Sequence, residues 1–236
     1  MLTRNLFLAD LAPGDLNVLT PNLRREVLEP GRVLFSEGQK PFTLYLPESV
    51  VVSVMTVMSD GRSVENANVG SEAALELLAV ATDEVVSSRS VVQIGGEVTT
   101  MPAAALRARL ADSPTLGQQI LRHAKTAACR CGETLACNTL HPADARLSKW
   151  LLRTADRVGR NEFAITQEYL AGIMGLQRTT VTAVASRLKK DGLIGYTRGR
   201  MRVLQPEALR ARACECYGDG PASGLARPME ARLQSR

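Results

Sequence analysis

Residues 163–204, FAITQEYLAGIMGLQRTTVTAVASRLKKDGLIGYTRGRMRVL, decide how the C-terminal part of this chain folds. Leu170 and Ile173 begin an apolar stripe at helical spacing, and Thr166 stands where its hydroxyl can cap that helix. Gly175 suits the left-handed backbone conformation that ends a helix and opens a tight turn. The pattern therefore predicts a first helix that stops at this glycine.

A second helix is predicted to begin near Gln177, because Val181, Val184 and Leu188 repeat three and four residues apart. The opposite face carries side chains that can hydrogen-bond to something outside the protein: Arg178, Thr179, Thr182 and Ser186. A helix with one apolar face and one hydrogen-bonding face, directly after a tight turn, is typical of the recognition helix of a helix-turn-helix.

A basic hairpin follows the second helix. Residues 194–196 and 201–203 read as short strands, and Arg198 and Arg200 stand in the loop, where guanidinium groups can bind phosphate oxygens. The segment therefore predicts a winged helix-turn-helix. A helical pair packed inside an ordinary domain is the alternative, and the agreement of small residues, apolar positions and basic wing favours the DNA-binding interpretation.

Charge is divided unevenly along the 236 residues, a length that fits one to two domains. From His141 onward there are 17 Lys/Arg and 9 Asp/Glu, whereas the preceding part has 12 and 15. This distribution favours nucleic-acid binding at the C-terminal end. A basic domain that lies on a membrane is the alternative, but the sequence has no strongly amphipathic Lys/Arg helix with large apolar residues.

The sequence predicts no membrane span, because it has no run of about 18 uncharged apolar residues. The first residues, MLTRNLFLADLAPGD, reach an acidic residue too early for a secretory signal. We therefore expect a cytoplasmic protein that does not contact the membrane.

In the N-terminal part, the sequence pattern changes from helical to strand-like at Gly31. Residues 1 to about 30 look helical, with Leu16, Leu19, Leu23 and Val27 apolar. Short strands separated by turns follow, with short helices expected at about 73–79 and 102–111. The predicted strands are 32–35, 43–46, 50–58, 63–69, 85–94 and 97–101. Many short strands at this spacing indicate an antiparallel sandwich or jelly roll.

A long helix is predicted to begin at Ser113-Pro114. Its small and apolar residues recur at spacings of three and four, which is typical of a helix–helix seam between two copies of the chain: Leu121, Ala124, Ala128, Cys131 and Leu135. A lone surface helix is the alternative. Helices at about 143–157 and 207–213 follow, and residues 218–236 are expected to be a disordered tail.

Several segments together resemble the Crp/Fnr family of bacterial transcription regulators, over about residues 5–217. The most specific are CNTLHPADARLSKWLLRTADR, the helix-turn-helix, TRGRMRVL and ACECY, and the upstream ones are GRVLFSEG, LYLPESV and SDGRSVENANVGSE. The resemblance implies an α+β chain that begins with an antiparallel jelly-roll sensor domain of the cyclic-nucleotide-binding type at 1–112. A dimerisation helix at 113–140 and a winged helix-turn-helix at 141–217 would follow, before a tail at 218–236.

The resemblance also implies a homodimer that binds a palindromic site in double-stranded DNA and works with RNA polymerase. The residues expected to contact DNA are Thr166, Gln177, Arg178, Thr179, Thr180, Thr182, Ser186, Arg198 and Arg200. Among them, the resemblance implies that Gln177, Arg178 and Thr179 begin the recognition helix. Better-known members have a glutamate where Thr179 stands, so the best-known operator sequence is not expected here. A sensor or adaptor that binds protein instead of DNA is the alternative.

A cyclic nucleotide is the effector that the resemblance suggests. Members that bind one use a Gly-Glu turn and an Arg-Ser pair, and the nearest matches here are Gly70-Ser71-Glu72 and Arg89-Ser90. Ser71 is an extra residue in the turn, and Val91 replaces a small residue after the pair. A degenerate pocket that no longer reads nucleotides, with Glu72 and Arg89 paired to each other or to solvent, is the alternative.

No catalytic residue and no metal site are predicted. The two histidines, His123 and His141, lie outside the predicted sandwich, so a metal-dependent jelly-roll enzyme is excluded. The five cysteines are expected to be reduced thiols. Cys129 and Cys131 point about 200° apart on a helix, which is poor geometry for a shared metal ion. A disulfide between two copies of Cys131 across the dimer axis is the sharper alternative.

Overall fold

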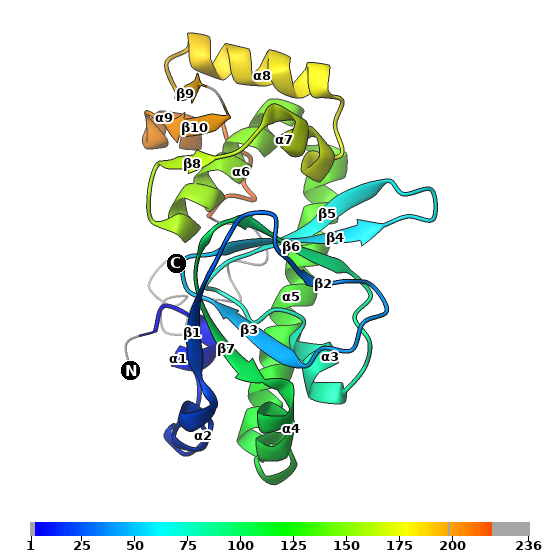
Figure 1. Cartoon of the computed structure of the whole chain (residues 1–236). Helices are drawn as coiled ribbons and strands as arrows, with labels where there is room; N and C mark the ends of the chain where they lie inside the picture. Colours follow the sequence, from blue (N-terminus) through cyan, green and yellow to red (C-terminus); the bar gives the residue numbers. More distant parts are fainter. Residues whose placement is uncertain (1–2, 198, 219–236) are drawn as a thin grey trace. The chain divides into compact units, whose positions relative to one another are not determined.

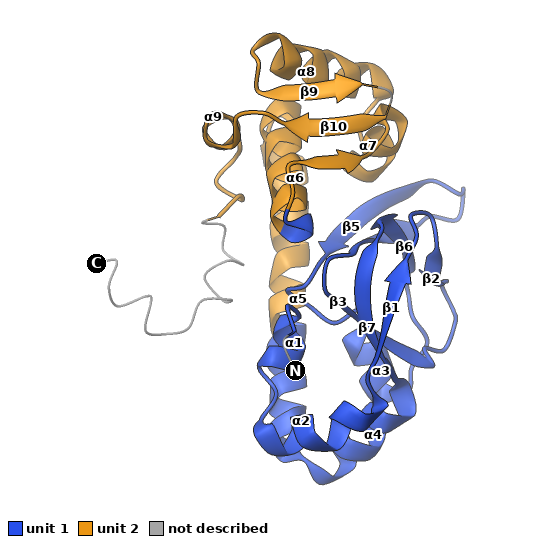
Figure 2. Cartoon of the chain, turned by 60° about the vertical axis from the view of Figure 1, so that its left-hand side comes forward, with its two compact units in different colours: residues 1–124, 157–159 blue, residues 125–156, 160–236 orange. Residues whose placement is uncertain are grey.

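The computed structural model describes residues 3–197 and 199–218 (Figure 1). The chain forms two compact units, residues 1–124 with 157–159 and residues 125–156 with 160–236 (Figure 2). The division falls inside the longest helix, α5 (Pro114–Leu140), whose 27 residues extend over about 40 Å. The predicted tail beyond Gly218 lies outside the described residues.

The first unit is built on two antiparallel sheets, which confirms the predicted fold class. One sheet has the order β1-β7-β3 and the other the order β2-β6-β4-β5. Their strands are β1 (Arg24–Leu28), β2 (Val33–Phe35), β3 (Thr43–Pro47), β4 (Val51–Val57), β5 (Ser63–Val69), β6 (Arg89–Ile94) and β7 (Gly96–Pro102).

An apolar core joins the two sheets. It contains residues of both, among them Leu28 and Val98 from the first sheet and Val52 and Val92 from the second. The alternation of a strand sends Tyr45 of β3 toward this core, while Leu44 and Leu46 point to the other face. The β1-β7-β3 sheet is therefore covered on both of its faces.

Helices cover that other face. A second apolar cluster combines Leu44 and Leu46 with helical residues such as Phe7, Leu106 and Leu116. The helical elements of this unit are α1 (Leu6–Ala9), α2 (Pro13–Leu19), the 3₁₀ turn η1 (Thr20–Asn22), α3 (Leu77–Thr82), α4 (Ala103–Asp112) and the first part of α5. This layer connects the sandwich to α5.

The largest differences from the sequence prediction are at three places. Residues 24–28 form strand β1 rather than continuing the N-terminal helices, because they pair with β7 from Arg24 opposite Thr100 to Leu28 opposite Gly96. Tertiary pairing here overrides an apolar pattern that also fits a helix. The helix expected at 73–79 begins at Leu77, and the strand expected from 85 begins at Arg89.

The second unit contains the second part of α5, most of α6 (Ala143–Val158) and the C-terminal elements. These are β8 (Glu162–Ala164), α7 (Gln167–Met174), α8 (Arg178–Lys190), β9 (Ile194–Thr197), β10 (Arg200–Val203) and α9 (Pro206–Arg210). Trp150 of α6 packs edge-on against Phe163 of β8, with ring centroids 6.2 Å apart. The unit thus has its own core, built where α6 meets the winged segment.

None of the helices in the described ranges, 3–197 and 199–218, is both long and apolar enough to cross a lipid bilayer.

Candidate nucleic-acid interface

The helix-turn-helix has the predicted local geometry. The Thr166 hydroxyl accepts a hydrogen bond from the Tyr169 backbone N–H at 3.1 Å, so it caps α7 as expected. Gly175 ends α7 in the left-handed conformation, with φ of 60°. The Leu176 N–H then donates to the Ala171 carbonyl at 3.0 Å, which closes the turn.

The two faces of α8 separate as predicted. Val181, Val184 and Leu188 are buried, each 2% exposed or less. The predicted DNA-contacting side chains of this helix and its N-cap are exposed, apart from the half-buried Thr180: Gln177, Arg178, Thr179, Thr182 and Ser186. An exposed hydrogen-bonding face on a helix anchored by its apolar face can enter the major groove of DNA.

Residues of α7 contact this exposed face. Arg178 Nη1 lies 3.1 Å from Glu168 Oε2, and the Thr182 hydroxyl donates to Gln167 Oε1 at 2.9 Å. Both pairs are at the surface, so a DNA phosphate or base edge can replace the protein partner at small cost.

The wing is a three-stranded antiparallel sheet with the order β8-β10-β9. Strand β8 is not among the predicted strands, because it becomes a strand only by pairing with β10, which lies far along the sequence. Its Glu162 neutralises two cations of β10, lying 3.4 Å from Arg200 and 3.2 Å from Arg202. Arg200 is exposed as predicted, whereas Arg198 lies outside the described residues.

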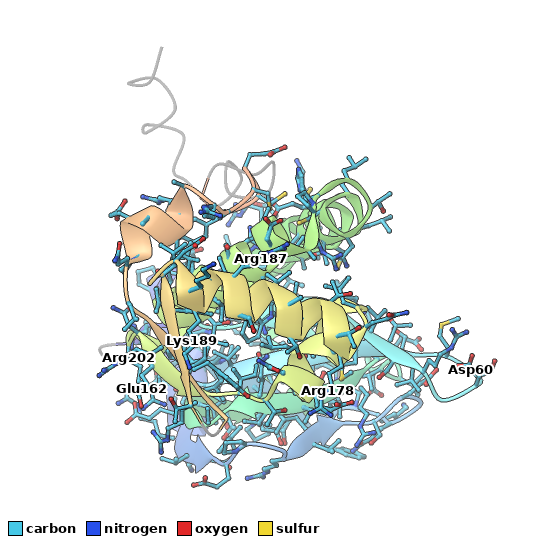
Figure 3. The ribbon with its side chains drawn as sticks, turned by 90° about the horizontal axis from the view of Figure 1, so that it is seen from above. Asp60, Glu162, Arg178, Arg187, Lys189 and Arg202 are labelled. Carbon is cyan, nitrogen blue, oxygen red and sulfur yellow. The ribbon has the colours of Figure 1, made fainter. Side chains whose placement is uncertain are left out.

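Lys189 and Arg202 also belong to this surface, although the sequence prediction does not assign them to DNA. Lys189 Nζ donates to the Tyr196 carbonyl at 3.2 Å, so it ties the end of α8 to the wing. Figure 3 shows Arg178 and Lys189 along one side of α8, Arg202 beside Glu162 on the wing, and Arg187 on the other side of α8. The positive side chains of α8 are therefore divided between two faces.

A buried arginine of α6 supports the turn. Arg146, 8% exposed, donates from Nη2 to the Met174 carbonyl at 2.5 Å, at the C-terminal end of α7. A cation at the C-terminal end of a helix interacts favourably with the helix dipole and so stabilises the helix. Burial lowers the pKa of the Arg146 guanidinium below its usual range. The sequence prediction misses this residue, because its role depends on α6 crossing beneath α7.

The predicted seam on α5 is exposed. Leu121 and Leu135 are 65% and 70% exposed, Ala128 and Cys131 are exposed, and Ala124 is partly exposed. Ile120 and Cys137 of the same helix are instead buried, 3% and 0% exposed. One side of α5 thus packs within the chain, while the predicted seam remains uncovered.

The five residues predicted to bind an effector differ in their contacts and in their exposure to solvent. Glu72 accepts hydrogen bonds from Arg157 Nε at 3.0 Å and Nη2 at 2.6 Å, and residues 157–159 belong to the first unit. A side chain at Gly70 would place its Cβ 2.7 Å from the Arg157 side chain. Arg89 is exposed, Ser90 is fully buried, and Ser71 is half-buried. The Glu72 carboxylate therefore pairs with Arg157. The sequence predicts instead that it binds a nucleotide, or pairs with Arg89 or solvent.

Three of the cysteines, which the sequence separates into two clusters, lie together with a histidine. Cys137 Sγ is 3.7 Å from Cys214 Sγ, and Cys216 Sγ is 3.6 Å from His141 Nδ1. Cys129 and Cys131 do not belong to this group, and all five cysteines are free thiols. The sequence prediction misses this cluster, because it considers only neighbouring cysteines as shared ligands.

Known proteins resemble the chain in this geometry and in sequence. Residues 145–212 match the family described as the Crp-like helix-turn-helix domain. The CRP-like cAMP-activated global transcriptional regulator of Mycobacterium tuberculosis is 25% identical over 220 residues, which cover 90% of this chain and 98% of that protein.

Solved structures also share the fold. FixK2 of Bradyrhizobium japonicum has a TM-score of 0.68 at 13% identity, covering 81% of this chain and 98% of its own. A CRP-family transcriptional regulator of Thermus thermophilus has a TM-score of 0.67 at 19% identity, covering 83% and 100%. Because the recognition helix is exposed, residues 145–212 match a Crp-like helix-turn-helix domain and the chain is similar in sequence to a transcription regulator, the chain is described as a DNA-binding transcription regulator similar to the Crp/Fnr type.

Proposed function

We propose that two copies of this chain bind a two-fold symmetric DNA site, with one α8 helix in the major groove of each half-site. The exposed face of α8 beside the basic wing supports this proposal most directly. In this proposal the exposed Arg178 reads a guanine or holds a phosphate, and the exposed Thr179, Thr182 and Ser186 offer hydroxyl groups to base edges. Arg198 and Arg200 are assigned to phosphates, which position the protein without specifying sequence.

The homodimer is proposed from α5. Leu121, Ala128, Cys131 and Leu135 follow one another at spacings of a helical seam and are exposed in the single chain. Two such helices packed together would bury these side chains. Two-fold symmetry of the protein then requires a palindromic site. RNA polymerase is the further partner we propose, and the cytoplasm the compartment.

Control by a cyclic nucleotide at residues 70–72 and 89–90 is the second candidate, since one relative is named as cAMP-activated. Two observations oppose it. Glu72 is engaged by Arg157, and Arg89 is exposed to solvent. We therefore propose that the first unit has lost nucleotide recognition at this position. Titration of the full chain with cAMP by calorimetry tests this, and saturable binding that Glu72→Gln abolishes would contradict it.

Selection of binding sites from random duplex DNA, followed by affinity measurements on the selected site, tests the DNA proposal. Loss of Arg178 in Arg178→Ala is expected to weaken binding by about 1–3 kcal/mol and to relax the preference at one base pair. Arg187→Ala is the matched control, because Arg187 is an exposed arginine on the other side of the same helix.

The salt dependence of binding separates phosphate contacts from base contacts. Arg200→Ala is expected to reduce the slope of log affinity against log salt by about 1, at every sequence tested. A folded dimer that binds no duplex DNA at low ionic strength would contradict the proposal. It would favour the alternative of a module that binds protein.

A further inference from the structure

We propose that Cys137, His141, Cys214 and Cys216 bind a single divalent transition-metal ion, with Zn²⁺ preferred. The four residues come from parts of the chain that are distant in sequence. Cys137 lies in the last turn of α5, His141 directly follows that helix, and the Cys214 and Cys216 pair follows α9. Their four ligand atoms nevertheless all lie within 4.8 Å of one another.

Two distances in the cluster match the edges of a tetrahedron around one ion. Bonds of about 2.3 Å from zinc to sulfur and about 2.0 Å to nitrogen give tetrahedron edges of about 3.8 Å between two sulfurs and about 3.5 Å between sulfur and nitrogen. The Cys137–Cys214 sulfur separation is 3.7 Å, and Cys216 Sγ lies 3.6 Å from His141 Nδ1. Three sulfurs and one imidazole nitrogen are also a donor set found in structural zinc sites.

The imidazole is oriented for this role. His141 Nδ1 faces Cys216, while Nε2 lies 3.3 Å from the Glu215 carboxylate. A histidine that ligates a metal commonly donates its other ring N–H to a carboxylate, which fixes the ring and its tautomer. Glu215 stands between the two cysteine ligands in sequence, so one short segment supplies two thiolates and the carboxylate that positions the imidazole.

The surroundings balance the charge of the complex. Binding replaces three thiol protons by metal–sulfur bonds and releases those protons to solvent, so three thiolates with Zn²⁺ carry a net charge of −1. Lys149 of α6, only 8% exposed, directs its ammonium group at Cys137 Sγ from 3.0 Å. A buried lysine requires a negative partner, and the thiolate complex supplies one.

A disulfide accounts for less of this geometry. The Cys137 and Cys214 sulfurs are 3.7 Å apart, and a bond between them at about 2.05 Å would leave Cys216 and the inward-turned His141 without a role. An iron–sulfur cluster fits less well, because its protein ligands are divided between two or more irons, so that some of them lie farther apart than ligands that share one ion.

The ion would fasten the C-terminal segment to the junction between α5 and α6. Other contacts converge on the same segment. Arg153 of α6 donates to the Cys216 carbonyl and pairs with Glu133 of α5 at 2.7 Å, and the Tyr217 hydroxyl donates to Asp156 at 3.0 Å. A metal ion bound here would hold the segment after α9 against the end of α5 and so help to order the second unit.

Metal analysis of the full chain, purified under reducing conditions without chelators, tests the proposal. We expect one zinc ion per chain by elemental mass spectrometry. Replacement of zinc by Co²⁺ should produce thiolate charge-transfer absorption and the visible bands of tetrahedral cobalt. A folded, reduced chain that binds neither ion would overturn the proposal, as would a Cys137–Cys214 disulfide found in the chain as isolated.

Variants locate the site. Cys214→Ser and Cys216→Ser are expected to lose the ion, whereas Cys131→Ser, which removes an exposed cysteine of α5 outside the cluster, should keep it. Because the first two variants can fail to fold, Glu215→Gln supplies a milder change. It should weaken zinc affinity about 10–100-fold against a competing chelator while the far-ultraviolet dichroism stays unchanged. Equal affinity in wild type, Glu215→Gln and a folded Cys214→Ser variant would overturn the proposal.

Discussion

Arg178 and Glu168 form an ion pair across the helix-turn-helix, with Nη1 and Oε2 3.1 Å apart and side chains 69% and 72% exposed. The first helix of the motif thus holds an acidic group beside the side chain that the DNA proposal relies on. DNA binding has to break or share this contact. Breaking this ion pair therefore adds a small free-energy cost to any contact between Arg178 and DNA.

Glu168→Gln is expected to increase DNA affinity about two- to fivefold, because an exposed ion pair contributes less than about 1 kcal/mol and the lost carboxylate no longer repels phosphates. Fluorescence anisotropy with a selected duplex measures the change. Glu207→Gln removes an exposed carboxylate of α9 instead and serves as the control. Weaker binding by Glu168→Gln would show that this carboxylate takes part in recognition.

Leu135→Glu should dissociate the proposed dimer, because it places two carboxylates in an apolar seam. Sedimentation velocity should show wild type as a dimer and the variant as a monomer at the same micromolar concentration. Val27→Glu is the matched control, since Val27 is 66% exposed and Leu135 is 70% exposed, but Val27 lies on β1. A dimeric Leu135→Glu variant would place the interface elsewhere.

Two glycines of the helix-turn-helix should respond to alanine with opposite sign. Gly175→Ala is expected to destabilise the fold by about 1 kcal/mol, because Gly175 has φ of 60° and alanine is strained there. Gly172→Ala lies inside α7 with open space around it and should stabilise by about 0.5–1 kcal/mol. Urea unfolding measures both, and equal effects would contradict the assigned end of α7.

Asp15 should make stability depend on pH. Burial acts to raise the pKa of this carboxyl, but hydrogen bonds from Ser113, Arg109 and Thr115 outweigh it and hold the pKa below the usual 3.8. The folded pKa lies below the unfolded one, so the stabilisation is complete above the unfolded value and disappears as pH falls through the folded value.

Asp15→Asn is therefore expected to cost about 1–3 kcal/mol at pH 7, where it loses the 2.7 Å bond to Arg109, and progressively less below pH 4. Thermal unfolding at several pH values measures this. Asp112→Asn, at an exposed carboxylate of α4, controls for the change in net charge. A difference that widens as pH falls would contradict the sign.

The winged helix-turn-helix could be predicted because its signals are local. Thr166 caps the turn that immediately follows it, Gly175 adopts a conformation that few other residues tolerate, and Val181 and Leu188 face the core by helical period alone. The spacing of Leu121 and Leu135 likewise identified an exposed side of α5. Such features depend on neighbours within a few residues.

Tertiary structure decided the features that depend on long-range contacts. Residues 24–28 form a strand because β7, which follows much later in the sequence, supplies their hydrogen-bond partners. Cys137 meets Cys214 across 77 residues only when α9 turns the chain back onto α5 and α6. Helical period and capping are properties of a short segment, whereas pairing and ligand convergence arise once the chain is packed. The sequence by itself therefore determined the DNA-binding element, and packing alone created the sulfur–imidazole cluster.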